Sequence, residues 1–510
     1  MDTSIASSRL NIFKNHPKAL FYLFFAEMWE RFSFYGLRAL LVLYMTSELQ
    51  FTDKKAYGVY AAYFTLVYLA TIVGGLIADR FLGNRKSIVA GAVLITFGHI
   101  SLSFAGIDSF FFYLGLGFIV GGTGLFKANI STLVGQLYEQ EDKHRDSGFT
   151  LFYIGINFGG LLAPLACGII GQVYGWHYGF GIASVGMLAG LVTFLQGCRH
   201  MDDKGLPADP SKLSKKLIPK ISTEHFIYIA SLLSVPLLSM VLIQYHWFES
   251  ALPVIGLFFG AYSLYLISVH RGEERRALIT IFTLMFFQTA FFSIFEQAGS
   301  SMNLFTERNV DRVFLGYEIP ASTFQSLNSF FIIFLGSLFA ALWSMLGKKK
   351  LDPSPAFKFA IALVQVGLGF VSLYWGVVTA DESGMASMLC LVIAYFFHTT
   401  GELCIMPVGL SMVTRISPKK ILSTVMGLWF VSLAFSEYLA GVFSKFASVE
   451  GGSQNIDPSQ TILVYGEAFA IGAKFAFLMA LILLCIIPIL NRNGKREPKF
   501  TNSRKEELTV

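Results

Sequence analysis

The stretch LFYLFFAEMWERFSFYGLRALLVLYM, from Leu20 to Met45, is long and apolar enough to cross a lipid bilayer, yet it contains Glu27, Glu30, Arg31 and Arg38. A charged side chain near the bilayer centre costs roughly 2.5 to 3.5 kcal/mol, so such residues usually face a watery cavity or one another. At about 100° per residue, Glu27, Arg31 and Arg38 share one helix face. A helix cap, or side chains that extend to the interface, is the alternative, but both ends of the stretch are far from Arg31. The stretch therefore predicts a membrane helix with one charged stripe.

The composition indicates an all-α polytopic membrane protein. Of 510 residues, 54% are hydrophobic and only 14% are charged, whereas soluble domains contain about 25% charged residues. Apolar runs of membrane-spanning length recur along nearly the whole chain and predict about 14 helices. The first twenty residues lack a separate apolar core and a cleavage site, so we expect the first span itself to direct insertion.

Lysine and arginine concentrate in every second loop, which is typical of loops on the cytoplasmic side. These residues are Arg80, Arg85, Lys86, Lys143, Arg145, Arg199, Lys212, Lys215, Lys216, Lys220, Arg271, Arg275, Arg276, Lys348, Lys349, Lys350, Arg415, Lys419 and Lys420. The termini share this basic character, so we expect both to be cytoplasmic. The net charge of +6 follows from this bias. A nucleic-acid patch in the linker at 212–220 is the weaker alternative, and we expect no nucleic-acid partner.

Five cysteines are present: Cys167, Cys198, Cys390, Cys404 and Cys485. Their odd number and their spacing favour neither a disulfide framework nor a metal site, and most lie within predicted spans. We interpret them as small apolar packing residues. We expect no metal and no other cofactor.

The order of spans suggests two halves. A polar linker follows the first six spans, two further spans occupy about 224–270, and a second group of six begins near Ala277. We therefore predict a six-helix bundle at 1–198, a cytoplasmic linker and two-helix hairpin at 199–271, a second six-helix bundle at 272–491, and a cytoplasmic tail at 492–510.

One loop of the first half resembles the G-x-x-x-D-R-x-G-R-K motif of the major facilitator superfamily. The matching residues are Gly75, Asp79, Arg80, Gly83, Arg85 and Lys86. Gly75 would permit close helix approach, and Asp79 with the basic residues would pair across neighbouring helices. The resemblance implies the major facilitator fold. In the second half only Gly347 and Lys348 to Lys350 remain at the equivalent place.

Further polar residues lie within predicted spans. Lys127 needs a counter-ion, and Glu27 and Glu30 are the natural candidates. Glu296 is a possible partner for Arg38. These and the other polar candidates are Lys127, Glu296, Glu402, Asn157 and Asn328. For the carboxylates and amides, structural hydrogen bonding within the protein is the alternative role. Glu437 and Lys474 are more ambiguous and are left outside the candidate site.

A buried carboxylate beside a mobile cation can couple a proton to a conformation, because moving the cation changes the affinity for the proton. Arg38 and Lys127 in one half and Glu402 in the other would give a cavity with opposite charges at its two ends. A short zwitterion fits that pattern better than a sugar or a simple anion.

Three motifs, in order along nearly the whole chain, resemble those of the proton-dependent oligopeptide transporter (POT) family, bacterial type. Residues 27–36, EMWERFSFYG, resemble E-x-x-E-R-F-x-Y-Y-G; residues 152–159, FYIGINFG, resemble F-Y-x-x-I-N-x-G; residues 401–410, GELCIMPVGL, resemble G-E-L-x-x-x-P-V-G-L. The resemblance implies import of di- and tripeptides with protons, in a bacterial inner membrane, by a chain that we expect to be monomeric.

The resemblance also implies roles for particular residues. Proton coupling would involve Glu27, Glu30, Arg31, Lys127 and Glu296. Substrate would contact Arg38, Tyr35, Tyr68, Lys127, Asn157, Asn328, Glu402 and Trp429, with the peptide carboxylate on Arg38 and Lys127 and its amino end on Glu402. Phe34 stands where the family motif has tyrosine, so the side chains that fit are expected to differ.

Other classes of membrane protein fit the sequence less well. A channel would need a continuous filter, and an enzyme would need a catalytic motif such as HExxH, GxSxG or a phosphate-binding loop, none of which occurs in the sequence. The serious alternative is a proton-coupled facilitator for another small substrate, such as an amino acid, nitrate or a peptide-like drug.

Overall fold

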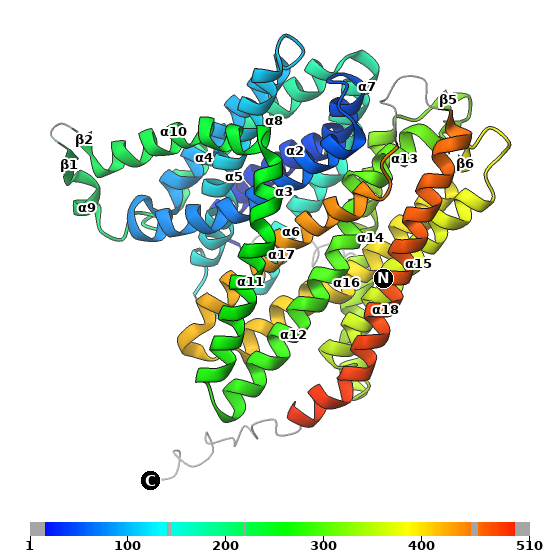
Figure 1. Ribbon diagram of the computed structural model, residues 1–510. Helices are drawn as coiled ribbons and strands as arrows, with labels where there is room; N and C mark the ends of the chain where they lie inside the picture. Colours follow the sequence, from blue (N-terminus) through cyan, green and yellow to red (C-terminus); the bar gives the residue numbers. More distant parts are fainter. Residues whose placement is uncertain (1–15, 140–141, 143, 219–220, 450–456, 495–510) are drawn as a thin grey trace, which may run out of the picture.

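The protein is helical almost throughout (Figure 1). The computed structural model describes residues 16–139, 142, 144–218, 221–449 and 457–494, so most of the tail expected at 492–510 lies outside the described residues. The helices are α2 (Lys18–Ser47), α3 (Asp53–Ile77), α4 (Gly83–Ser103), α5 (Ser109–Gln136), α6 (Arg145–Ala163), α7 (Ile169–Tyr174), α8 (Trp176–Gly197), α9 (Pro210–Ser214), α10 (Thr223–Ile243), α11 (Tyr245–Val269), α12 (Gly272–Phe295), α13 (Ser301–Asn309), α14 (Ser326–Lys348), α15 (Pro355–Val378), α16 (Leu389–Ile416), α17 (Leu422–Lys445) and α18 (Pro458–Gly494).

Short strands occur only in pairs outside the bundles of long helices, within the part of the chain described. They are β1 (Lys216–Ile218), β2 (Ile221–Ser222), β3 (Val310–Asp311), β4 (Val313–Phe314), β5 (Tyr317–Glu318) and β6 (Ala386–Ser387). β1 pairs with β2 and β4 with β5 in antiparallel fashion, and β3 pairs with β6 in parallel.

Twelve helical segments among the described residues are long and apolar enough to cross a membrane. The helix α2 is not among them because of its charged stripe. One of the twelve, Asp53–Ser103, has 51 residues, which is far too long for a single crossing at about 1.5 Å per residue. It contains α3 and α4, which are joined by a π-helical segment, Ala78–Leu82, that ends at Gly83 with a φ of 71°. These two features account for the difference from the 14 or so helices expected, and the all-α polytopic fold is confirmed.

Polar residues between the apolar runs begin several helices. The Thr52 side chain accepts a hydrogen bond from Lys55 N at the start of α3, and Asp108 accepts one of 2.7 Å from Phe110 N at the start of α5. Such side chains satisfy backbone N–H groups that have no partner within the helix. The helix boundaries thus follow from where the sequence changes from polar to apolar.

The long helices form two bundles (Figure 1). In the first bundle α2, α3, α4, α5, α6 and α8 pack against one another, and in the second α12, α14, α15, α16, α17 and α18 do so. The bundles meet mainly through α3 against α17 and α6 against α14. The hairpin helix α10 packs along α5, whereas α11 touches α3, α12 and α17.

The loop between α3 and α4 contacts its own half and the hairpin. Lys86 Nζ lies 2.6 Å from Glu224 Oε1 at the start of α10, and the Arg85 guanidinium donates to backbone carbonyls of the linker. The expectation that Gly75 permits close helix approach does not hold, since an added Cβ there would lie 4.0 Å from Ala128 Cβ, an ordinary van der Waals contact. Gly74 permits that approach instead, since an added Cβ there would lie 1.9 Å from the carbonyl oxygen of Gly124.

Candidate functional site

A cavity of about 220 Å³ lies between the two bundles. The first bundle contributes Glu27, Arg31, Phe34, Tyr35, Arg38, Phe64, Tyr68, Lys127, Ser131, Tyr153, Ile156 and Asn157, and the second contributes Phe292, Phe295, Glu296, Asn328, Ile332, Glu402, Met406, Leu433, Ser436 and Glu437. We call it the central cavity. Of the site residues expected from the sequence, only Glu30 and Trp429 are absent from its wall.

Three charges of the α2 stripe, Glu27, Glu30 and Arg31, pair with one another within that helix. Arg31 Nε lies 3.1 Å from Glu27 Oε1, and the Arg31 guanidinium also forms an ion pair with Glu30. All three side chains are at least 96% buried. The guanidinium further lies 4.8 Å from the centre of the Phe34 ring, within the range of a cation–π contact. Two carboxylates around one buried cation form a compact acidic cluster, which can hold a proton without leaving a bare charge.

Lys127 differs from the expectation. No carboxylate among the described residues lies within ion-pairing distance of its ammonium, because Arg31 occupies both Glu27 and Glu30. The ammonium instead lies 4.2 Å from the centre of the Tyr68 ring and 5.5 Å from that of Phe34. Aromatic faces attract a cation but leave its charge uncompensated. Lys127 is therefore available to an anionic partner in the cavity.

Arg38 and Glu296 form the ion pair expected of them, and it connects the bundles. Arg38 Nη2 lies 2.8 Å from Glu296 Oε2, with side chains 13% and 11% exposed. Glu296 begins a tight 3-10 turn, Glu296–Gly299, directly after α12. Gly299 lets this turn lie close to α2 and α3, since an added Cβ would lie 1.8 Å from the Tyr60 hydroxyl and 3.0 Å from Arg38 Nε.

Glu402 lies on the opposite wall, on α16. Asn328 Nδ2 donates to Glu402 Oε2 at 2.9 Å and to Thr399 Oγ1 at 3.1 Å. One amide thus positions the carboxylate from a neighbouring helix, while the cavity side of the carboxylate is left for a cation. Asn157 Nδ2 donates to the backbone carbonyl of Tyr153 at 3.0 Å, which uses one of its two N–H donors and leaves its oxygen without a role in that bond.

The expectation that Trp429 lines a substrate pocket does not hold in this structure. Trp429 is fully buried, and its ring lies against Gly409 of α16, outside the wall of the central cavity. Conversely, Glu437 on α17 does line the cavity, although it was not among the residues expected there. The sequence did indicate this position, because a carboxylate within an apolar span is costly unless it faces a cavity or a partner.

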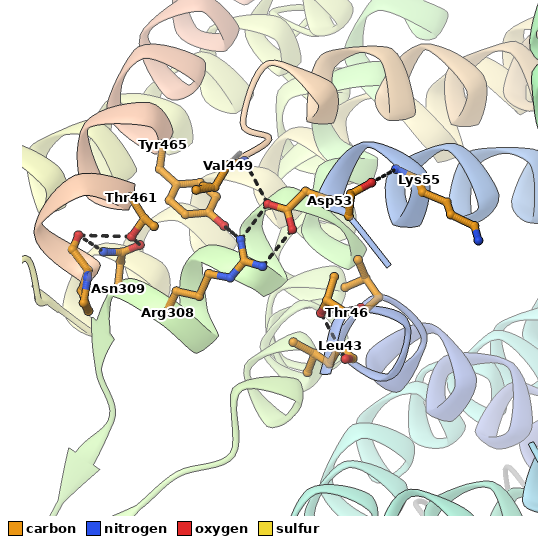
Figure 2. A network of polar contacts seen from close by, with 12 residues as sticks. Leu43, Thr46, Asp53, Lys55, Arg308, Asn309, Val449, Thr461 and Tyr465 are labelled. Carbon is orange, nitrogen blue, oxygen red and sulfur yellow. Dashed lines mark hydrogen bonds and ion pairs between the residues drawn. The ribbon is translucent and has the colours of Figure 1, made fainter. Parts of the chain in front are cut away.

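A second polar cluster joins the bundles away from the cavity (Figure 2). Asp53, at the start of α3, accepts hydrogen bonds of 2.7 and 2.8 Å from both terminal nitrogens of Arg308 on α13. Val449 N donates to the same carboxylate at 3.0 Å, and Arg308 donates to the Tyr465 hydroxyl at 3.2 Å. We call these four residues the Asp53 cluster. Its parallel double hydrogen bond between charged groups is among the strongest polar contacts available to side chains.

Hydrogen bonds between the two bundles are concentrated at the end that holds the Asp53 cluster. Besides that cluster, Asn303 Nδ2 donates to Ala39 O at 2.9 Å, and Gln172 bonds to both Glu307 and Ser322. At the opposite end, where α2 begins and α18 ends, no such bond joins the bundles in the part of the chain that the structure describes. The bundles are thus tied together at one end only.

Two helical bundles around a charged cavity at mid-depth form the arrangement of a membrane transporter. A profile described as the POT family matches residues 85–456. The chain belongs to the POT family, as its motifs predicted, and it is a multi-pass membrane transporter with the major facilitator fold, not an enzyme.

Relatives and solved structures agree with this assignment. The chain is 37% identical over 462 residues to the peptide transporter YePEPT of Yersinia enterocolitica subsp. palearctica serotype O:3 (strain YE-P4), covering 87% of this chain and 90% of that protein. It is 30% identical over 508 residues to dipeptide and tripeptide permease A of Cronobacter turicensis, covering 98% and 97%. The crystal structure of a peptide transporter POT in complex with sulfate has 33% identity and a TM-score of 0.79, covering 94% and 96%.

Proposed function

We propose that this chain is a proton-coupled symporter that imports di- and tripeptides by alternating access. The observation that carries the proposal is the opposition of charges across the central cavity. Arg38 and Lys127 line it from the first bundle and Glu402 lines it from the second. A peptide presents a carboxylate at one end and an ammonium at the other, so each terminus would meet its opposite charge. The names of two relatives, a peptide transporter and a dipeptide and tripeptide permease, support the same substrate class.

Two ion pairs support the coupling to protons. The Arg38–Glu296 pair joins the bundles directly, so a proton on Glu296 would release Arg38 for a substrate carboxylate. The cluster of Glu27, Glu30 and Arg31 would hold a second proton beside Lys127. Because proton and substrate would act on the same cations, each would favour binding of the other.

The one-sided ties between the bundles support alternating access. The basic loops predict that both termini are cytoplasmic; α2 would then cross the membrane once before Asp53, and the Asp53 cluster would lie at the outer end. The bundles would then rock about the central cavity, breaking that cluster to open outward and forming it to open inward.

Uptake into proteoliposomes tests this function. Purified protein is reconstituted at neutral internal pH, an acidic external buffer is added, and accumulation of labelled dialanine is measured with and without an uncoupler. Accumulation above the external concentration that the uncoupler abolishes is the expected result. Equal internal and external concentrations under the gradient would overturn proton coupling.

A competition panel tests the substrate class. Unlabelled dipeptides and tripeptides should reduce uptake of labelled dialanine, whereas single amino acids and nitrate should not. Strong competition by an amino acid or nitrate, with none by tripeptides, would favour the alternative of a facilitator for another small substrate.

A further inference from the structure

Glu437 is a buried carboxylate that the charge pairs described above leave unused. It lies on α17, is 5% exposed and lines the central cavity. Within the part of the chain that the structure describes, no hydrogen-bond donor and no cation lies within bonding distance of its carboxylate. Buried carboxylates are normally paired or hydrogen-bonded, because an isolated buried charge is costly. Glu437 therefore needs a cation or a proton from within the cavity to compensate its charge.

The groups that face Glu437 come from several elements. α17 packs against α3, α12 and the turn after α12. Electrostatic interactions link Glu437 to five titratable groups: Tyr60 and Tyr68 of α3, Glu296 of the turn, Arg38 of α2 and Lys127 of α5.

The remaining neighbours of α17 carry charges, but none pairs with Glu437 in the part of the chain that the structure describes. α16 carries Glu402, which lines the same cavity and accepts a hydrogen bond from Asn328. α18 and the turn before α17 carry four charges that are exposed and lie outside the cavity wall: Glu467, Lys474, Lys419 and Lys420. α11 contributes Glu249, which pairs with Lys445 at 2.6 Å near the end of α17. The charges that matter for Glu437 are consequently those of the cavity.

The charge balance of the cavity then singles out two groups. Arg31 is neutralised by Glu27 and Glu30, and Arg38 by Glu296. Three charges are then left without an ion-pair partner: Lys127 on one wall, and Glu402 and Glu437 on the other. Glu402 accepts a hydrogen bond of 2.9 Å from Asn328, whereas the side chains of Lys127 and Glu437 have neither an ion pair nor a hydrogen bond among the described residues. A substrate carboxylate that binds Lys127 would enter this space as a second negative charge beside Glu437. Two like charges in a cavity of low dielectric repel strongly, and a proton on one of them removes that repulsion.

We propose that Glu437 makes binding of the substrate carboxylate depend on a proton: it balances Lys127 in the empty cavity and takes up a proton when the substrate carboxylate replaces it. This inference rests on the proposed function, because it assumes a substrate with a carboxylate at Lys127. The sign follows from linkage. If substrate and proton bind together, affinity falls as pH rises, by up to about tenfold per pH unit for one linked proton.

The test is the pH dependence of dialanine affinity, measured by calorimetry on the purified full chain between about pH 5.5 and 8. In Glu437→Gln the neutral amide replaces the protonated carboxylate with little change of shape. The variant should keep its affinity for dialanine at high pH. For each unit by which the pH rises, the affinity of the wild type should fall by a factor up to about ten times larger than that of the variant. Glu467→Gln, which removes an exposed carboxylate of α18 outside the cavity, is the matched control and should follow the wild-type profile.

A second measurement needs no variant. Dialanine amide lacks the carboxylate, so its affinity for the wild-type protein should change less with pH than that of dialanine, by the factor seen in Glu437→Gln. Parallel profiles for the two ligands, or for wild type and Glu437→Gln, would overturn this inference while leaving the proposed function standing. A wild-type protein that binds dialanine at no pH would overturn both.

Discussion

Removing the charge of Asp53 should release the end of the molecule at which the bundles are tied. Its carboxylate is 3% exposed and holds both terminal nitrogens of Arg308, itself 14% exposed. Removing one partner of a buried ion pair typically costs about 3 to 5 kcal/mol. The lower value applies to Asp53→Asn, because the introduced amide oxygen could still accept from Val449 N and Arg308 would keep the Tyr465 hydroxyl. A shift of about 3 kcal/mol changes the ratio of the two conformations roughly 150-fold.

Spin labels can measure this change. Ile107 in the first bundle's α4–α5 connection and Tyr317 in β5 are 76% and 80% exposed, and both lie at the end of the Asp53 cluster. Spin labels are attached to cysteines introduced at these two positions, with Cys485 and Cys198 replaced by serine. Pulsed electron paramagnetic resonance then measures the distance between the labels, which reports the separation of the bundles. Asp53→Asn should add a population with a longer separation.

Two further variants make the result specific. Asp381→Asn removes an exposed carboxylate that bonds only within its own loop, and its distance distribution should match that of the parent protein. The exchange Asp53→Arg with Arg308→Asp should restore much of the short separation. An Asp53→Asn distribution identical to those of the parent and of Asp381→Asn would refute the reasoning.

Three other outcomes are expected. Lys127→Ala should reduce proton-driven accumulation of dialanine to equilibration while facilitated exchange remains, as counterflow assays would reveal. Arg38→Ala and Glu402→Ala should each weaken dialanine affinity by about 2 kcal/mol, roughly thirtyfold, in calorimetry, and unchanged affinity in both would discredit the clamp on the peptide termini. Burial and the nearby His144 hold the pKa of His16 below its usual value, so the unfolded chain binds that proton more readily. Stability is therefore lost as pH falls through about 6.5, and the melting temperature should fall less on acidification in His16→Gln.

The charged stripe of α2 could be predicted because its residues lie close in sequence. A spacing of four residues on a helix fixes the distance between Glu27 and Arg31 whatever the tertiary packing. The partner of Lys127 was predicted wrongly because it depends on packing between helices and not on spacing along one helix. The sequence identifies a buried cation on α5, but only the packed structure reveals that Arg31 already holds both nearby carboxylates.

Features formed between distant segments could not be predicted. Asp53 and Arg308 are 255 positions apart in the chain, and no periodicity connects the start of one helix with the end of another. Whether Trp429 faces the cavity or the space beside Gly409 depends on how α16 and α17 pack. Glu437 is different, since its position within an apolar span marked it as a buried charge that needs a partner or a cavity.

The hairpin between the halves has a mechanical consequence. At the end that holds the Asp53 cluster, the Tyr245 ring lies directly over Gly58 of α3, while Glu249, one turn further along α11, binds Lys445 of α17. A single helix thus contacts both halves at this end. Under the proposed alternating access the halves would part here, so each outward opening would detach α11 from one half or the other, and the inserted hairpin would resist that movement.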